Sequence, residues 1–253
     1  MFSRALLKKP CRNFVHGLST AGLGLPDYEK ALLQHAAYAD ALRSCGVEPT
    51  ILAADEHYPD SVFIEDTAVL SEKVAVIARP GASSRRGEEI ATIEALAAVY
   101  DRMEYIVAPG TLDGGDVLRA GRQFFIGISA RTNEAGGSQL AAILTRNGYD
   151  AVLVSLRHVL HLKTGVAYLE NNRLLASGEF IAHPQLGQFQ IIPVAHEEAC
   201  AANALWINGR VLMASGFAAT KNAIENAGYE TMAVDVSEFR RLDGGLSCLS
   251  LRF

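Results

Sequence analysis

Four short polar clusters interrupt the apolar stretches of this sequence and contain its candidate reactive side chains: residues 59–66, 110–118, 158–165 and 243–253. Asp113 lies in a glycine-rich turn that exposes its carboxylate, and Cys248 follows a Gly-Gly pair that lets a ligand or other backbone come close. His161 stands in an apolar stretch, where a charged imidazole would be costly. Together, a cysteine, a histidine and an acid are the parts of a thiol nucleophile system.

Taken one at a time, these residues have simpler structural explanations. Cys248 is consistent with a core cysteine, His161 with a hydrogen-bonded core histidine, and Asp113 with a turn residue. A free thiol has a pKa near ~8.5, so only a few per cent of it is thiolate at neutral pH. A nucleophilic Cys248 therefore needs a neighbouring cation, and either His161 or a cationic substrate could supply it.

Other chemistries receive less support from the sequence. The spacing of His158 and His161 would suit a metal only on a helix, with Cys248 as third ligand, and the flanking strand pattern disfavours a helix there. Motifs for a phosphate loop, a dinucleotide fold and a nucleophile elbow are absent. The cysteines form no C-x-x-C pair, which predicts free thiols at Cys11, Cys45, Cys200 and Cys248.

The elements that must position these residues alternate between helices and short strands along the whole chain. Apolar residues at spacings of three and four predict helices over 28–45, 87–100, 134–148 and 219–228. β-branched or aromatic stretches bounded by Gly, Pro, Asn or Asp predict strands over 74–80, 105–109, 123–129, 151–156, 173–177, 189–194, 211–215 and 231–236.

A faint internal repeat relates these elements. Residues 124–156 read strand, turn, helix, Asn-Gly-Tyr and strand, and residues 211–236 read strand, turn, helix, Ala-Gly-Tyr and strand. Similar units begin near residues 5, 74 and 173, so the unit is roughly 50 residues long, which indicates a ring or solenoid. An open α/β sheet is the alternative. No Pro- or Ser-rich linker divides the chain, which predicts one domain over 1–253.

Length and composition exclude several classes of protein. The chain has 253 residues, of which 49% are hydrophobic, so disorder is excluded as its main state. A net charge of −5 argues against nucleic acid as the main partner. No apolar run approaches the ~20 residues of a membrane span, and the apolar stretch at the start is too short for a secretory signal. We therefore expect a cytoplasmic protein with a sizeable core.

Six motifs, in this order, carry a resemblance to a known family: FIEDT (63–67), RPGASSRRGE (79–88), LDGGDV (112–117), GISARTN (127–133), HLKTG (161–165) and DGGLSC (243–248). The chain resembles the dimethylarginine dimethylaminohydrolases, members of the guanidine-modifying (pentein) superfamily with arginine deiminases and amidinotransferases. The resemblance implies a five-bladed α/β propeller of ββαβ repeats, which agrees with the repeat length.

The resemblance also implies roles for individual residues. Cys248 would be the nucleophile, His161 the general acid and base, and Asp113 the acid that holds the imidazole. Asp66 would grip the substrate guanidinium, with Glu65 supporting the site. The substrate's amino-acid end would be bound by Arg85 and Arg131 at the carboxylate, by Asp60 and the backbone of Leu18 and Leu242 at the amino group, and covered by a lid over 17–26.

The expected reaction is hydrolysis of Nω-methylated L-arginine to L-citrulline and a methylamine, through an S-alkylthiouronium on Cys248 and without a cofactor or a metal. Arginine deiminases typically carry HLDT where this chain has 161-HLKT-164, and their Asp is a second carboxylate on the guanidinium. Lys163 in its place favours a methylated substrate. An arginine deiminase and a catalytically silent propeller that binds partners are the alternatives. The expected partner is a small-molecule substrate, with no nucleic acid and no membrane, and the sequence leaves monomer and homodimer open.

Overall fold

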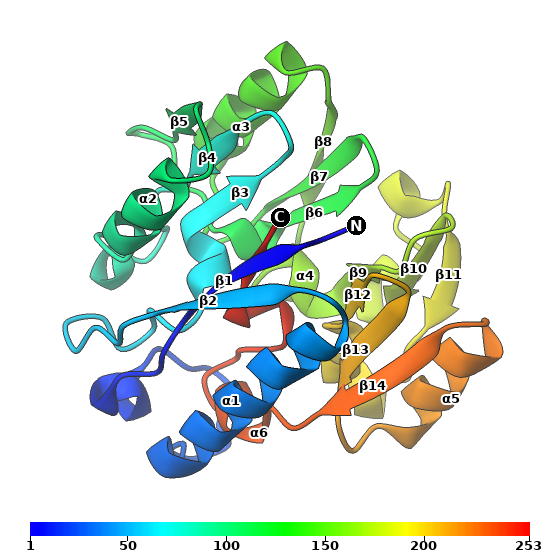
Figure 1. Ribbon diagram of the computed structural model, residues 1–253. Coiled ribbons are helices and arrows are strands. Elements are labelled where there is room, and N and C mark those ends of the chain that lie inside the picture. The colour runs from blue at the N-terminus through cyan, green and yellow to red at the C-terminus, as the bar shows by residue number, and fades with distance from the viewer.

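The structure, a computed structural model, describes residues 1–253 and consists of five three-stranded sheets arranged in a ring (Figure 1). In each sheet the central strand pairs antiparallel with one neighbour and parallel with the other. In chain order the sheets comprise β15 (Leu251–Arg252), β1 (Arg4–Lys8) and β2 (Glu48–Leu52); β3 (Ala68–Leu70), β4 (Ala75–Ile77) and β5 (Met103–Tyr105); β6 (Val117–Ala120), β7 (Gln123–Ile128) and β8 (Asp150–Ser155); β9 (Val166–Tyr168), β10 (Arg173–Ala176) and β11 (Gln190–Pro193); and β12 (Leu205–Ile207), β13 (Arg210–Ala214) and β14 (Glu230–Val234).

A helix connects the central strand to the parallel strand in four of the sheets, because a parallel pair needs a long crossover. These helices are α1 (Tyr28–Ser44), α2 (Glu89–Ala97), α3 (Glu134–Arg146) and α5 (Ala218–Asn226). The side chain of Asp27 caps α1 by accepting from Lys30 N, and Asn133 caps α3 by accepting from Gly136 N. In the fourth sheet two short 3₁₀ turns, η5 (Gly178–Phe180) and η6 (Pro184–Leu186), replace the helix.

The ring is closed by the two ends of the chain, which lie near its middle in Figure 1. β15 pairs antiparallel with β1, in the register Ala5 with Arg252 and Leu6 with Leu251. Phe253 extends the pairing, since its amide donates to Arg4 O and its carbonyl accepts from Arg4 N, both at 2.9 Å. The first sheet therefore contains both ends of the chain, and the last turn before β15 is held against residues from the start of the sequence.

The expected five-unit ring is confirmed, and the open-sheet alternative is wrong. Units begin at β1, β4, β7, β10 and β13, as the repeat predicts. The strand expected over 105–109 is wrong: β5 ends at Tyr105, and Ile106 N donates to Ile77 O as the chain leaves the sheet. Sequence analysis named no strand at β2, and it missed the antiparallel partner strands β3, β6, β9, β12 and β15, whose two to four residues are too few to show a period.

The largest apolar cluster lies beneath the polar clusters at 59–66 and 243–253. The rings of Phe14 and Phe239 are 5.5 Å apart between centroids, and Phe63 packs against both. A Cβ on Gly244 would lie 2.2 Å from the Phe63 ring, so only glycine allows the two clusters to approach this closely. The core thus fixes the backbone on which Asp66 and Cys248 are placed.

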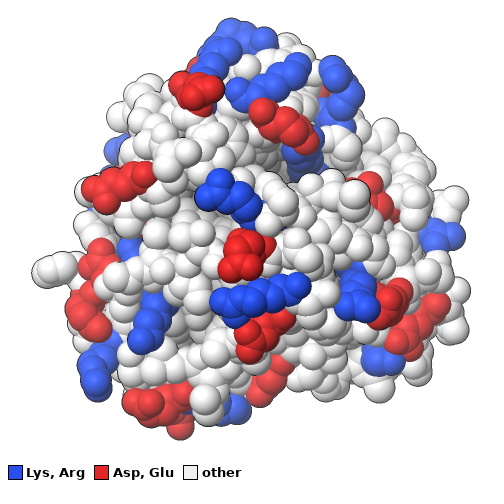
Figure 2. All heavy atoms as spheres, viewed as in Figure 1, with Lys and Arg blue, Asp and Glu red and all other residues white.

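The outside of the ring carries charges of both signs. On the face shown in Figure 2, acidic and basic side chains are interspersed. None of the helices combines the length and the hydropathy needed to cross a membrane.

Candidate active site

Each of the five short inner strands is preceded by a helical turn, and these turns come together at one end of the ring. They are η2 (Ile64–Thr67), η4 (Gly114–Asp116), α4 (Leu162–Gly165), η7 (His196–Ala202) and η8 (Ser247–Leu249). η2 packs against η4 and η8, and α4 packs against η4 and η7. Asp66, Asp113, His161 and Cys248 stand within or directly before four of these turns. The repeat therefore assembles the predicted catalytic residues from four different units.

His161 and Asp113 form a buried pair. Nε2 of His161 lies 3.0 Å from Oδ2 of Asp113, and the other oxygen of Asp113 accepts from Gly81 N at 2.9 Å. Burial would lower the pKa of His161, but Asp66 and the hydrogen bond to Asp113 outweigh it and raise this pKa to about 9. The imidazole is thus a cation at neutral pH, with Nε2–H donating to Asp113 and Nδ1–H available as an acid.

Asp66 presents a charged carboxylate beside this pair. Its Oδ1 accepts from Gly115 N at 2.8 Å and its Oδ2 from Arg85 Nη1 at 2.6 Å. Burial alone would raise the pKa of Asp66, but the charges of His161 and Arg85 hold it at about 2. A Cβ on Gly115 would lie 2.8 Å from Oδ1 of Asp66 and 2.9 Å from Nδ1 of His161, so a side chain here would separate the two groups.

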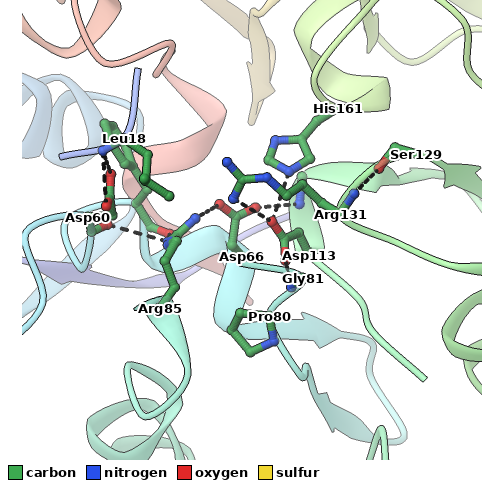
Figure 3. Close-up of polar contacts among 12 residues, drawn as sticks. Leu18, Asp60, Asp66, Pro80, Gly81, Arg85, Asp113, Ser129, Arg131 and His161 are labelled. Atoms are coloured by element: carbon green, nitrogen blue, oxygen red, sulfur yellow. Dashed lines mark hydrogen bonds and ion pairs between the residues drawn. The ribbon is translucent and has the colours of Figure 1, made fainter. Parts of the chain in front are cut away.

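The two arginines predicted to bind the carboxylate differ in how many of their N–H groups are already hydrogen-bonded within the protein. Arg85 is buried, and its guanidinium donates to Asp66, to both oxygens of Glu88 and to Phe63 O. Only one of its five N–H groups, on Nη1, is left for a ligand. Arg131 is 18% exposed at the side chain, and its Nη1 lies 3.8 Å from Oδ2 of Asp113. In Figure 3, Arg85 points toward Asp66 and Arg131 lies beside Asp113. Arg131 therefore has more N–H donors free for a ligand than Arg85.

The predicted amino-group contacts lie on the other side of Arg85. Oδ1 and Oδ2 of Asp60 accept from Leu18 N at 3.0 and 3.2 Å (Figure 3). Burial raises the pKa of Asp60, while Arg85 and the Leu18 amide oppose the shift. The amide of Leu242 donates to Phe239 O. Because an ammonium needs acceptors, Leu18 and Leu242 can contribute only their carbonyl oxygens to such a group.

The segment expected to form a lid, 17–26, lies against residues 241–243. Ser19 Oγ donates to Arg241 O at 2.6 Å, and Thr20 N donates to Asp243 at 2.5 Å. Leu23 O accepts from the Arg241 guanidinium. Leu25 is 74% exposed, so polar contacts rather than apolar burial hold this segment over residues 241–243.

Cys248 is only partly covered, and its thiol is not ionised at rest. Burial raises the pKa of Cys248 to about 12, and the charges of Glu65 and Asp66 add to the shift. The amide of Gly245 donates to Sγ at 3.4 Å and, like the charge of Lys163, acts in the opposite direction. The free site therefore combines a neutral thiol with an imidazolium, and a cation beside Sγ would favour the thiolate.

Lys163 turns into the protein, where it pairs with Glu65. Its Nζ lies 2.6 Å from Oε1 of Glu65, and Arg252 Nη2 lies 3.0 Å from the same oxygen. The other carboxylate oxygen of Glu65 is buried without a partner. These three residues line a cavity that includes none of Cys248, His161 and Asp66, so they are placed to support the site from behind.

Asp116 is a polar residue of the site that sequence reasoning missed. It is fully buried; its Oδ1 accepts from Leu162 N at 3.0 Å and its Oδ2 from Ser129 Oγ at 2.7 Å. Ser129 Oγ in turn accepts from Arg131 N at 3.0 Å. Burial raises the pKa of Asp116 to about 6, against the opposing charge of His161. A second acid in 112-LDGGDV-117, directly before an apolar strand, was the available signal.

One group of side chains has the spacing of metal ligands. One ligand atom from each of Asp66, Asp113 and His161 lies within 4.8 Å of the others. The charge of His161 at neutral pH, with Nε2–H directed at Asp113, opposes metal binding in this state. His158 and Cys248 do not belong to the group, and His158 is exposed, so the metal site considered from the sequence is not the one assembled.

Comparisons with known proteins agree with this geometry. The family model described as N,N dimethylarginine dimethylhydrolase, eukaryotic, matches residues 26–250. The N(G),N(G)-dimethylarginine dimethylaminohydrolase of Pseudomonas aeruginosa is 48% identical, with 100% of both chains covered, and that of Streptomyces coelicolor is 37% identical over 98% of this chain and 96% of its own. A solved structure of the Pseudomonas protein, a cysteine-to-serine variant complexed with citrulline, matches all of both chains with a TM-score of 0.99.

The ring of five units and the partly covered cysteine beside a buried histidine and buried carboxylates define a hydrolase with the α/β-propeller fold of the guanidine-modifying enzymes. Within that class, the chain belongs to the dimethylarginine dimethylaminohydrolase family.

The elevated pKa of His161 can be measured directly. Nuclear magnetic resonance titration of the imidazole should give a midpoint near pH 9, and Asp66→Asn should move it down toward 6.5 because the largest charge that raises it is removed. Since the folded-state pKa lies above the unfolded value, His161 stabilises the fold fully below pH 6.5, and the contribution is lost as pH rises through about 9. A midpoint at or below 6.5 in the unsubstituted protein would contradict this electrostatic description.

Proposed function

We propose that the protein hydrolyses Nω-methylated L-arginine to L-citrulline and dimethylamine or methylamine. The observation that carries the proposal is the convergence of a charged Asp66, an imidazolium at His161 and the Cys248 turn at one end of the ring. A carboxylate is the natural partner of a planar alkylguanidinium. The β15–β1 pairing supports treating residues 1–253 as one catalytic domain.

Binding orients the substrate between two groups of residues. Asp66 would hold the guanidinium, while Arg131 and the free Nη1–H of Arg85 would bind the α-carboxylate. Asp60 and the carbonyl oxygens of Leu18 and Leu242 would accept from the α-amino group. Because charged side chains would bind both the α-carboxylate and the α-amino group, small amines that lack the carboxylate should bind poorly.

The first chemical step begins when the substrate cation approaches Sγ. The cation lowers the thiol pKa, and Cys248 releases its proton to solvent, where the departing amine later takes up a proton. The thiolate attacks the guanidinium carbon, forming a C–S bond, and His161 delivers a proton to the methylated nitrogen. The C–N bond breaks, methylamine or dimethylamine leaves, and an S-alkylthiouronium remains on the enzyme with a neutral imidazole.

Water completes the reaction. His161 accepts a proton from water as its oxygen attacks the thiouronium carbon, and Asp113 stabilises the imidazolium that forms again. The C–S bond breaks, citrulline is released with a new C=O group, and Cys248 recovers its proton. Overall, one water is consumed and the departing amine takes up a proton, so charge is balanced without an oxidant or a cofactor.

Lys163 supports a preference for methylated substrate. Its ammonium is engaged by Glu65 at 2.6 Å, so this position supplies no carboxylate to the guanidinium. Asp66 then remains the main carboxylate contact, and the far side of the guanidinium is free for one or two methyl groups. An unmethylated guanidinium would keep donors without partners in this site, which weakens its binding selectively.

Replacement of Cys248, and not of the other cysteines, should abolish activity. Cys248→Ser should lower citrulline formation by about 10³-fold or more, because a hydroxyl is a far poorer nucleophile here than a thiolate. Cys200→Ser is the matched control, since Cys200 is also a partly exposed free thiol, and it should retain nearly full activity. Full activity of Cys248→Ser in a citrulline assay would overturn the mechanism.

Removal of the acid–base group should trap the intermediate. With His161→Gly no group remains to activate water, so an adduct should accumulate on Cys248 with a substrate analogue whose leaving group needs no protonation, such as S-methyl-L-thiocitrulline. Intact-protein mass spectrometry would detect it. His158→Ala is the control, because His158 is exposed and outside the site; an inactive His158→Ala beside an active His161→Ala would refute the assignment.

Substrate comparison tests the function itself. The value of kcat/KM for asymmetric dimethylarginine should exceed that for arginine by about tenfold or more, since each buried methyl adds roughly 1 kcal/mol and the arginine site lacks a second carboxylate. Product analysis with arginine, monomethylarginine and asymmetric dimethylarginine side by side provides the measurement. Faster turnover of arginine would reassign the protein as an arginine deiminase.

A further inference from the structure

The fifth turn of the ring contributes no ionisable group to the proposed chemistry. η7 ends at Ala202, and Asn203 follows it, two residues before β12, whereas the predicted catalytic residues stand within or directly before their turns. Asn203 is buried, with 7% of its surface exposed. Its position raises the question of what an uncharged amide does among four turns that carry reactive groups.

The side chain of Asn203 joins the two catalytic segments. Its Nδ2 donates to Lys163 O at 2.9 Å, two residues after His161, and to Ser247 Oγ at 2.9 Å. Its Oδ1 accepts from Ser247 N at 2.9 Å, one residue before Cys248. All the hydrogen-bonding groups of the amide except one acceptor position are therefore used to hold α4 against η8.

The neighbouring residues restrict the position of the Asn203 amide. A Cβ on Gly245 would lie 2.5 Å from Cγ and Oδ1 of Asn203, so the glycine backbone packs flat against the amide. On the far side of Ser247, Arg252 donates to the Ser247 carbonyl at 3.2 Å and to Glu65, which also binds the Lys163 ammonium. The Lys163 and Ser247 segments are thus joined twice, through Asn203 and through Glu65 and Arg252.

We propose that Asn203 is a positioning residue that sets the separation between Cys248 and His161. The inference rests on the proposed function, because it assigns the amide a role in aligning the nucleophile with the acid and base of that reaction. Asn203 contacts none of the residues placed on the substrate. Its loss should therefore slow chemistry, which depends on alignment within about 1 Å, and leave substrate binding largely unchanged.

The test compares two asparagines whose side chains each make three hydrogen bonds, Asn203, which is buried, and Asn208, which is half-buried. Asn208 also donates from Nδ2 to two acceptors, Phe2 O at 2.7 Å and Cys45 O at 3.0 Å, and accepts from Phe2 N at 2.8 Å. It lies between β12 and β13 and contacts no catalytic segment. Asn203→Asp and Asn208→Asp each keep the volume and remove two donated bonds, and Asn203→Ala removes the amide without adding charge.

Both Asn203 variants should lower kcat for asymmetric dimethylarginine by about 10- to 100-fold while KM changes by less than about threefold. Asn208→Asp should leave both constants near those of the unsubstituted protein, even if its melting temperature falls as far. Unchanged kcat in the Asn203 variants overturns the proposal. It is also overturned if the Asn203 and Asn208 variants lose activity equally for the same fall in melting temperature.

Ser247→Ala keeps the proposal testable if the Asn203 variants fold poorly, and where they fold, a double-mutant cycle with Asn203→Ala adds a second test. Ser247→Ala removes one of the three hydrogen bonds, and we expect this single substitution to lower kcat. Its effect and that of Asn203→Ala should be non-additive, because both substitutions act through one contact. Unchanged kcat in Ser247→Ala, or full additivity, overturns the proposal. The unsubstituted protein is assayed in parallel: absence of citrulline there would refute the proposed function, whereas citrulline with unaffected variants would refute only the role of Asn203.

Discussion

Antiparallel pairing of β15 with β1 is the contact on which the site depends. Without it, the fifth unit would lie next to an open edge, and the Cys248 turn would have no fixed relation to the first two units. The pairing is short, but the hydrogen bonds of Phe253 extend it, and the apolar cluster of Phe14, Phe63 and Phe239 supports the adjoining turns. Closing the ring places the last turn of the chain against the turn that contains Asp66.

Charge balance is the second requirement of this arrangement. Asp66, Asp113, Asp116 and Glu65 are all nearly inaccessible to water, and isolated buried carboxylates would be strongly destabilising. Each accepts a hydrogen bond or ion pair from Arg85, His161, Lys163, Arg252 or a backbone amide. The cost of desolvation is thereby offset in the folded state, and the charges are already oriented before a ligand arrives.

The electrostatics of the free site connect the proposed acid and nucleophile to the charge of the ligand. The carboxylates keep His161 protonated, but they also oppose the thiolate of Cys248. In the proposed mechanism, a cationic substrate would relieve that repulsion, so that a ligand of the correct charge activates the nucleophile. In the proposed mechanism, the same carboxylates would therefore bind the guanidinium, hold the acid in its charged form and restrain the thiol until the substrate is present.

Much of this organisation can be read from local sequence. The repeat of roughly 50 residues predicted the ring, because each unit must place its own hairpin and helix in the same order. The predicted helices at 28–45 and 134–148 agree with α1 and α3 because capping residues and apolar spacing act locally. Asp113, His161 and Cys248 could be selected because each is a reactive group in an unusual local setting of glycines or apolar residues.

The tertiary structure alone decided which groups share protons and charges. No local pattern pairs Lys163 with Glu65 or raises the pKa of His161 to about 9, since these partners lie on different units. Asn203 shows the limit most clearly: an asparagine after a helical turn is ordinary in sequence, and its contacts with Lys163 and Ser247 span 40 and 44 residues. The sequence determined the units and their reactive side chains, whereas closure of the ring determined their distances, because hydrogen bonding and Coulomb interaction depend on separation in space.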